Sequence, residues 1–277
     1  MSTKMMAQKT DKELAFLHDL FVANDWSERF AQQVDEHVEL PEKGRALYLA
    51  VGTGGHAIAL QERAEALKFL GVEESDECVE IARAKAMAVK DAAEFRQGRV
   101  DDLSLEDNCF DFVVGDGSLV EPARVPKMLS EMVRVAKPGA VVALSLPTSS
   151  SFGEFFSIYW EVLHNCGLTG HEADVKQLIS ELPSVSEVEG LAEREGLEQI
   201  TSWSRIEEFT FDSGEKFLNA PLVSDFLMNR WLETIPEDSR GAVRQEIPRI
   251  VNEDRHDAEF TLSVKATLVL GRKSRSH

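Results

Sequence analysis

The chain has 277 residues, of which 43% are hydrophobic and 8% aromatic, enough to bury a sizeable core in one large domain or a domain with an insertion. Its 49 acidic residues outnumber 30 basic ones, for a net charge of −19, which argues against nucleic acid and anionic membranes as partners. The three cysteines, Cys78, Cys109 and Cys166, form no CxxC pair, so we expect neither a disulfide framework nor a metal site. Without an apolar run that could span a bilayer or serve as a signal peptide, we expect a cytoplasmic protein.

The N-terminal part of the chain has a helical pattern. Residues 1–11 are polar, and apolar residues then recur at helical spacing between residues 13 and 38. This pattern predicts two helices with a break near Asn24 and Asp25. We therefore expect residues 1–43 to form an N-terminal helical cap.

Strand and helix signals alternate through the next hundred residues. Short apolar runs predict strands at 46–51, 66–72, 94–97, 110–115 and 140–146, with helices at 55–64, 76–89 and 125–136 between them. Such repeated units with apolar strands are typical of a parallel sheet covered by helices on both faces. The sequence therefore predicts a doubly wound α/β core over residues 44–148.

The pattern changes after Pro147. Aromatic residues cluster between Phe152 and His164, and helical segments dominate 213–256, so we expect residues 149–256 to form a lid that also supplies part of a sheet hairpin. Residues 257–277 close the chain with a strand at 260–270. Its first part alternates apolar and polar residues, which indicates an antiparallel strand at the edge of a mixed sheet.

A glycine-rich turn follows the first predicted strand. The segment Ala46-Leu47-Tyr48-Leu49-Ala50-Val51-Gly52-Thr53-Gly54-Gly55 leads from a strand into a helix. Glycines let the backbone turn tightly and let a ligand lie against it, and the helix N-terminus offers free N–H groups. Many nucleotide-binding folds share such a turn, so it does not identify the ligand by itself.

Acidic residues follow the second and third strands. Glu73 lies about 20 residues after Gly52, the spacing at which an acid accepts the two hydroxyls of a ribose, and Glu74 is the neighbouring candidate. Asp101 and Asp102 follow the third strand, where one of them can accept a hydrogen bond from an adenine amino group while Leu103 packs on the ring. Plain helix-capping or solvent-facing roles for these two aspartates remain an alternative.

These segments together resemble the class I S-adenosylmethionine-dependent methyltransferases, in particular those with small-molecule substrates. The matching segments, in family order and spacing, are Gly52-Thr53-Gly54-Gly55, Glu73, Asp101-Asp102-Leu103, Phe110-Asp111-Phe112-Val113-Val114 and Arg134-Val135-Ala136-Lys137-Pro138-Gly139-Ala140. The resemblance covers about residues 44–147 and the closing strand. It implies a Rossmann-like, mostly parallel seven-stranded sheet with N-terminal helices and a helical lid insertion.

The resemblance also implies the cofactor and its contacts. S-adenosyl-L-methionine would be bound with Gly52 and Gly54 under its methionine part, Glu73 on the ribose, and Asp102 with Leu103 at the adenine. Gly115 would offer its backbone carbonyl to the amino group of the cofactor.

Two positions depart from the family pattern. The family carries an acid where this chain has Tyr48, and a glycine where it has Ala50. The acid normally helps to organise the turn and the cationic end of the cofactor. We expect the ring of Tyr48 to lie near the sulfonium, where a cation–π contact is favourable.

The sequence names no catalytic base. Methyl transfer from a sulfonium is an in-line displacement in which the protein mainly positions the acceptor and excludes water. His56, His164 and His171 are candidates, although a lone histidine is more often a surface or packing residue. The aromatic residues of the lid favour an apolar or aromatic small molecule as the acceptor, yet their spacing equally suits a buried helix face.

Two other functions fit part of the pattern. A nicotinamide-dependent oxidoreductase would use the same glycine turn and Glu73, but it explains neither the Asp101-Asp102 pair nor the Lys137-Pro138-Gly139 turn. A non-catalytic binding module with a methyltransferase-like fold is the second alternative, motivated by Tyr48 and Ala50.

Overall fold

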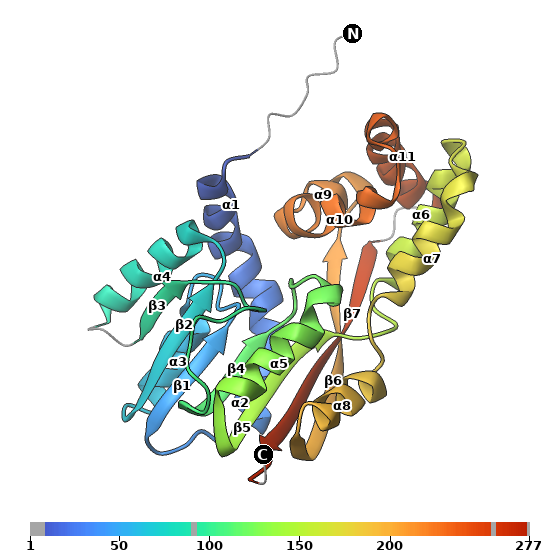
Figure 1. Ribbon diagram of the computed structural model, residues 1–277. Helices are drawn as coiled ribbons and strands as arrows, with labels where there is room; N and C mark the ends of the chain where they lie inside the picture. Colours follow the sequence, from blue (N-terminus) through green and yellow to red (C-terminus); the bar gives the residue numbers. More distant parts are fainter. Residues whose placement is uncertain (1–8, 90–92, 256–258, 276–277) are drawn as a thin grey trace.

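The computed structural model describes residues 9–89, 93–255 and 259–275. A seven-stranded sheet in the order β3-β2-β1-β4-β5-β7-β6 forms its centre (Figure 1). The strands are β1 (Gly44–Leu49), β2 (Leu67–Glu73), β3 (Glu94–Gln97), β4 (Phe110–Asp116), β5 (Ala136–Pro147), β6 (Leu197–Phe211) and β7 (Phe260–Lys273). The first five strands are mutually parallel, and β7 runs antiparallel to both β5 and β6. The predicted doubly wound, mostly parallel sheet is confirmed.

The prediction that the closing strand lies at the edge is wrong. Strand β7 lies between β5 and β6, and β6 is the edge strand. The alternation that suggested an edge is present in the first half of β7, where buried residues alternate with partly exposed ones. There the strand packs one face on the lid helices, whereas its second half is largely buried.

Helices cover both faces of the sheet. Helices α5 (Val125–Val135) and α8 (Val185–Arg194) share one apolar cluster with one face. Helices α2 (Glu28–His37), α3 (Gly55–Arg63) and α4 (Asp76–Ala88) contribute to the cluster on the other face. This layering is what the alternating strand and helix signals predict.

The N-terminal helices run on without the predicted break. Helix α1 (Asp11–Leu17), the π-helical segment η1 (His18–Ser27) and α2 follow one another directly. The side-chain amide of Asn24 donates to the backbone carbonyl of Asp19 at 3.0 Å inside this segment. Asn24, which suggested a break in the sequence, therefore stabilises a wide π-helical turn. The side chains of Val22, Trp26 and Phe30 are all buried.

A third apolar cluster holds the helices of residues 149–256, the predicted lid. It joins the helices α6 (Gly153–Asn165), α7 (Glu172–Ser180), α9 (Gly214–Asn219), η4 (Leu222–Leu227), α10 (Met228–Trp231) and α11 (Glu237–Arg255) to the far ends of β6 and β7. Figure 1 shows these helices gathered beyond the upper edge of the sheet, across from α1. Val22, Trp26 and Phe30 pack into the same cluster, so the N-terminal helices and the lid share one core. Within the described ranges, no helix is long and apolar enough to cross a membrane.

Candidate functional site

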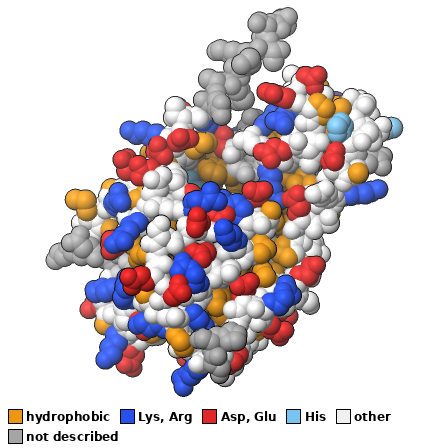
Figure 2. Space-filling model, viewed as in Figure 1, with side chains coloured by type: hydrophobic (Ala, Val, Ile, Leu, Met, Phe, Trp, Pro, Cys, Tyr) orange, Lys and Arg blue, Asp and Glu red, His pale blue; other side chains and the backbone are white. Residues whose placement is uncertain are grey.

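A cavity of about 860 Å³ opens at the carboxyl ends of β1, β2 and β4. The order of the parallel strands reverses between β1 and β4, which is where ligands bind in open α/β sheets. The glycine turn, the ends of these strands and the N-terminal helices line the cavity. Figure 2 shows this face of the molecule hollowed between α1 and the helices α9 and α10.

The glycine turn is shaped by close neighbours as well as by its sharp bend. Gly52 and Gly54 have φ values of +55° and +80°, in the left-handed region that favours glycine. A Cβ on Gly54 would lie 2.7 Å from the ring of Phe95, and one on Gly52 would lie 2.6 Å from Cε1 of His18. Ala50 has a φ of +53°, which explains why the family has a glycine there.

The N-terminal segment η1 is tied down onto this turn by polar contacts. Thr53 Oγ1 donates to Asp19 Oδ1 at 2.6 Å, and Lys85 Nζ on α4 donates to the same carboxylate and to Thr53 Oγ1 at 3.2 Å. The three residues therefore connect η1, the glycine turn and α4. Helix η1 roofs the cavity at the point where the turn forms its floor.

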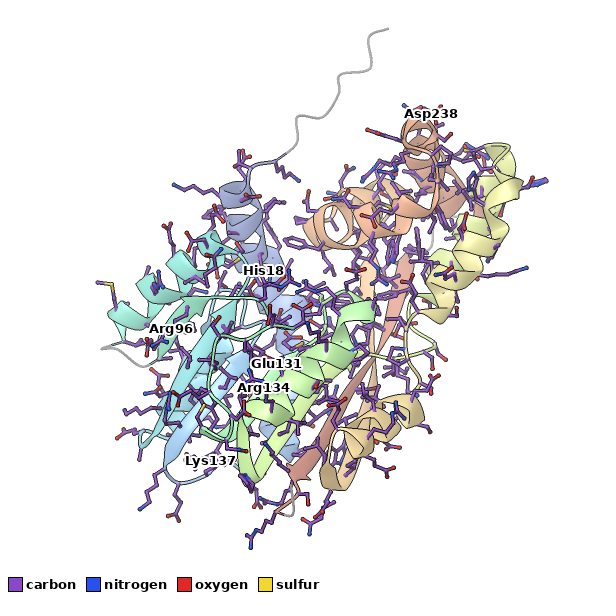
Figure 3. The ribbon with its side chains drawn as sticks, in the orientation of Figure 1. His18, Arg96, Glu131, Arg134, Lys137 and Asp238 are labelled. Carbon is purple, nitrogen blue, oxygen red and sulfur yellow. The ribbon has the colours of Figure 1, made fainter. Side chains whose placement is uncertain are left out.

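His18 is a cavity residue that sequence reasoning missed. Figure 3 shows it where the N-terminal helix meets the upper edge of the sheet. Its ring makes an edge-on contact with Phe226 of the lid, with ring centroids 5.7 Å apart, and burial lowers its pKa to about 4. Its Nδ1 is buried without a hydrogen-bond partner among the described residues. No sequence motif marks it, since the contact depends on how η1 folds back over the turn.

Glu73 lies at the end of β2 and lines the cavity, as predicted. Its Oε2 accepts from the backbone N–H of Gly52 at 2.9 Å, and its Oε1 accepts from those of Glu74 and Ser75 at 2.8 and 3.2 Å. Burial raises the pKa of its carboxyl group. The side chain thus bridges the first two strand-end loops, and Oε2, which accepts one hydrogen bond, keeps acceptor capacity for a ribose hydroxyl.

The other predicted acids are held by arginine. Arg124 donates to Glu74 and, at 2.9 Å, to Asp101, and it holds the pKa of both carboxyl groups below their usual range. Glu74 lines the cavity, whereas Asp101 does not. Asp102 is exposed and lies outside the cavity lining, and Leu103 is buried in the core beside α5.

The residues that line this part of the cavity are Gln97 and Val100. Val100 donates its backbone N–H to Glu74 Oε1 at 3.2 Å. The sequence could not show that Arg124, just before α5, binds Asp101. The adenine contact of Asp102 and Leu103 stays a prediction.

At the end of β4 the cavity is lined by Asp116 and not by Gly115. A Cβ on Gly115 would lie 2.7 Å from Met128 Cε, so its Cα faces α5. Asp116 Oδ1 accepts from the backbone N–H of Ser118 at 2.9 Å, and burial raises the pKa of Asp116 to about 6. Trp26 Nε1 in turn donates to Ser118 Oγ at 3.0 Å.

Tyr48 lines the cavity but is held by its own partners. Its hydroxyl lies 3.0 Å from His56 Nδ1, and His56 Nε2 lies 3.2 Å from Asp35 Oδ1, which also pairs with Arg63. Burial raises the pKa of Tyr48, so the phenol is neutral. Where the family has an acid, this chain therefore has an uncharged hydroxyl that is hydrogen-bonded to His56 on α3.

A smaller cavity of about 230 Å³ adjoins the first under the lid. The residues that line both cavities are Ser118, Leu119, Val120, Glu121 and Phe226. Among the aromatic residues between Phe152 and His164, Phe152 lines the smaller cavity. Phe155 instead stacks on Trp231 inside the lid core, with ring centroids 4.1 Å apart. His164 and His171 line neither cavity, whereas His56 lines the larger one.

The match to a known family covers the strands and the glycine turn at this site. Residues 46–139 match the family described as a methyltransferase domain. A demethylmenaquinone methyltransferase of Deinococcus radiodurans is 34% identical over 120 residues, which are 42% of this chain and 50% of that protein. One of Bacillus cereus is 28% identical over 180 residues, 60% of this chain and 73% of that protein. The chain thus spans half the length of the first relative and about three quarters of the second.

Solved structures agree on the fold. The YcgJ protein of Bacillus subtilis has a TM-score of 0.57 at 14% identity, over 90% of this chain and 99% of that one. A Haemonchus contortus phosphoethanolamine N-methyltransferase, solved with S-adenosylhomocysteine, has a TM-score of 0.57 at 18% identity, over 97% of this chain and 59% of that one.

The topology also separates the methyltransferase from the oxidoreductase alternative. Dinucleotide-binding folds have the strand order 3-2-1-4-5-6. Here an antiparallel seventh strand is inserted between β5 and β6. From this topology and the match of residues 46–139, we conclude that the core of the chain has the fold of a methyltransferase domain.

Proposed function

We propose that this protein transfers a methyl group from S-adenosylmethionine to a small, largely apolar acceptor. The observation that carries the proposal is the pair of joined cavities. The larger one lies over the glycine turn, and the smaller one meets it along residues 118–121 under the lid. A donor site and an acceptor site that share a wall are the arrangement that an in-line displacement needs.

The residues of the larger cavity fit the cofactor. Its methionine part carries a sulfonium and an ammonium group, and two carboxylates, Glu73 and Asp116, line the cavity at the ends of β2 and β4. The buried Nδ1 of His18, which lacks a partner among the described residues, offers a further polar contact beside Gly52. We assign the glycine turn to the methionine part and Glu73 to the ribose.

When bound, the cofactor supplies an electrophilic methyl group on a cationic sulfur. The protein has to orient the acceptor and keep water out. The lid core and the roof formed by η1 serve the second purpose, because they cover the strand ends with buried aromatic side chains. We assign no catalytic base.

The acceptor pocket is mostly apolar. Leucine, valine, proline and aromatic side chains form most of its wall, namely Leu119, Val120, Pro122, Val125, Leu146, Pro147, Phe152, Leu182, Pro183, Phe226, Leu227 and Trp231. Glu121, Arg230 and Glu233 supply charge at the same pocket. A flat aromatic or quinol-like ring with polar substituents suits this wall, and the names of the two similar proteins, which refer to demethylmenaquinone, support the same class.

The proposal is tested first without an acceptor. Calorimetric titration with S-adenosylhomocysteine should show micromolar binding that Glu73→Ala weakens. Glu80→Ala, an exposed acid on the neighbouring helix α4, serves as the matched control and should leave binding unchanged. Absence of binding at millimolar ligand would contradict the proposal and favour a non-catalytic module. Positive binding is followed by turnover assays with demethylated quinols and other small aromatic acceptors.

The predicted role of Tyr48 has its own test. If its ring stabilises the sulfonium by a cation–π contact, Tyr48→Phe should retain affinity for S-adenosylmethionine and Tyr48→Leu should lose it. Equal affinity of both variants would show that the ring makes no such contact.

A further inference from the structure

Strand β4 ends in an acidic residue, Asp116, whereas β1 carries the uncharged Tyr48 where the family has an acid. The family acid that helps to hold the cationic end of the cofactor is replaced by Tyr48. The hydroxyl of Tyr48 is bonded to His56, and the phenol carries no charge. A site for a cationic ligand therefore needs its negative partner from another strand.

Asp116 lies in the place from which that partner can come. Strands β1 and β4 are adjacent and parallel, with Tyr48 opposite Val114 and Leu49 opposite Gly115. Asp116 is the last residue of β4, so it lies level with Ala50, where the glycine turn begins. Asp116 lines the larger cavity, two residues before Ser118, where the wall shared with the smaller cavity begins.

Of the acids that line the cavity, Glu73 and Asp116 lie at the ends of β2 and β4, and they differ in how many hydrogen bonds they already accept. Glu73 accepts three backbone N–H groups through both of its oxygens. Asp116 is held by Ser118, through its backbone N–H to Oδ1 and through its hydroxyl, and among the described residues no lysine or arginine forms an ion pair with it. A carboxylate held this way keeps acceptor capacity for a ligand.

The surroundings of Asp116 favour a cation. Its carboxylate is desolvated, Glu73 adds negative charge nearby, and both raise its pKa, while His56 opposes them. An ionised carboxylate in such a place is costly unless it is paired, and an ammonium group that binds there removes that cost. The same pairing orients the methionine part along the glycine turn.

We propose that Asp116 binds the α-ammonium group of the cofactor, in place of the acid that β1 lacks. This inference rests on the proposed function and adds the residue that selects for the amino-acid part. Asp116 is a binding residue and takes no part in proton transfer.

The test compares two ligands and two proteins in a calorimetric cycle. The ligands are S-adenosylhomocysteine and its analogue without the amino group, and the proteins are the full chain and its Asp116→Asn variant. Removing either partner should weaken binding by about tenfold or more, because charge-assisted hydrogen bonds are the strong ones. Removing both should cost no more than removing one.

Asp111→Asn is the matched control. Asp111 lies at the opposite end of the same strand, where it pairs with Lys137 at 2.7 Å, far from the cavity lining. This variant should bind both ligands as the unmodified chain does. Binding of the desamino analogue by Asp116→Asn shows in the same experiment that the variant is folded.

The outcomes separate the inference from the proposed function. Additive losses, or equal binding of both ligands by the unmodified chain, overturn the role of Asp116 and leave the cofactor site standing. The second of these results needs no variant, so misfolding of Asp116→Asn cannot hide it. Binding of neither ligand by the unmodified chain overturns the proposed function and the inference together.

Discussion

The floor of the larger cavity and the lid above it are held by different interactions. Polar contacts between loops fix the floor: Glu73 bridges to Gly52, and Arg124 joins Glu74 to Asp101. The lid is a packed cluster of aromatic and aliphatic side chains around Phe155 and Trp231. The difference teaches that the larger cavity depends on a few charged residues, whereas the smaller cavity under the lid depends on the packing of apolar side chains.

The largest effect is expected from the lid. Phe155 is fully buried and stacks on Trp231, so Phe155→Ala should lower the free energy of unfolding by about 3–5 kcal/mol. Urea denaturation measures the change. Phe16→Ala removes the same ring from a side chain that is 59% exposed and should change stability little. A loss confined to the lid should leave a folded floor that still binds S-adenosylhomocysteine; loss of that binding would mean that floor and lid unfold as one unit.

The floor should respond to pH through Asp116. Its pKa is raised from an ordinary value of 3.8 to about 6, so the folded state holds a proton that the unfolded state releases. The stability that this proton provides is present at low pH and is lost as the pH rises from about 4 through 6, by about 2 kcal/mol in the ligand-free protein. His56, Glu73 and Tyr48 are the titratable groups that face it.

Denaturation curves between pH 4 and pH 7 measure this change. Asp116→Asn should be less sensitive to pH over that range, while Asp111→Asn should follow the unmodified chain. Identical curves for the unmodified chain and Asp116→Asn would show that Asp116 titrates normally.

The arginine cluster should contribute less. Arg124→Ala leaves the buried Asp101 with Arg99 alone and should cost about 1–2 kcal/mol of stability. Arg99→Ala removes a cation from the same carboxylate, but Arg99 is 64% exposed, so its loss should be close to neutral. Thermal denaturation of the two variants compares them directly. Equal losses would mean that the two arginines share Asp101 evenly.

The same contrast explains what could be predicted from the sequence. The five parallel strands, the glycine turn and Glu73 follow from local patterns, because their apolar runs and turn residues are read within a short window. The break at Asn24 and the edge position of the closing strand were wrong. Both depend on partners far along the chain: η1 packs into the lid core, and β6 pairs with β7 on its outer side.

The candidate site divides in the same way. Tyr48, Ala50, Gly52, Gly54, Glu73 and Glu74 line the larger cavity, and Asp101, Asp102, Leu103 and Gly115 do not. The positions of the second group depend on contacts with residues far along the chain, such as the pairing of Arg124 with Asp101. His18 and Asp116 were missed for opposite reasons. His18 lies outside any motif. Asp116 directly follows Gly115, and the resemblance implied a role for the Gly115 backbone and none for the Asp116 side chain.

The smallest effect concerns Ala50, where the floor departs from its family. Its φ of +53° costs an alanine about 1 kcal/mol or more relative to a glycine, but a glycine also gains entropy in the unfolded chain. Ala50→Gly should therefore stabilise the protein by less than about 1 kcal/mol. Ala46→Gly, in the interior of strand β1 just before the turn, should instead destabilise it. Because Ala50 lines the larger cavity, tighter binding of S-adenosylhomocysteine by Ala50→Gly would show that its methyl group crowds the ligand, whereas unchanged binding with a more stable protein would confine its effect to backbone strain.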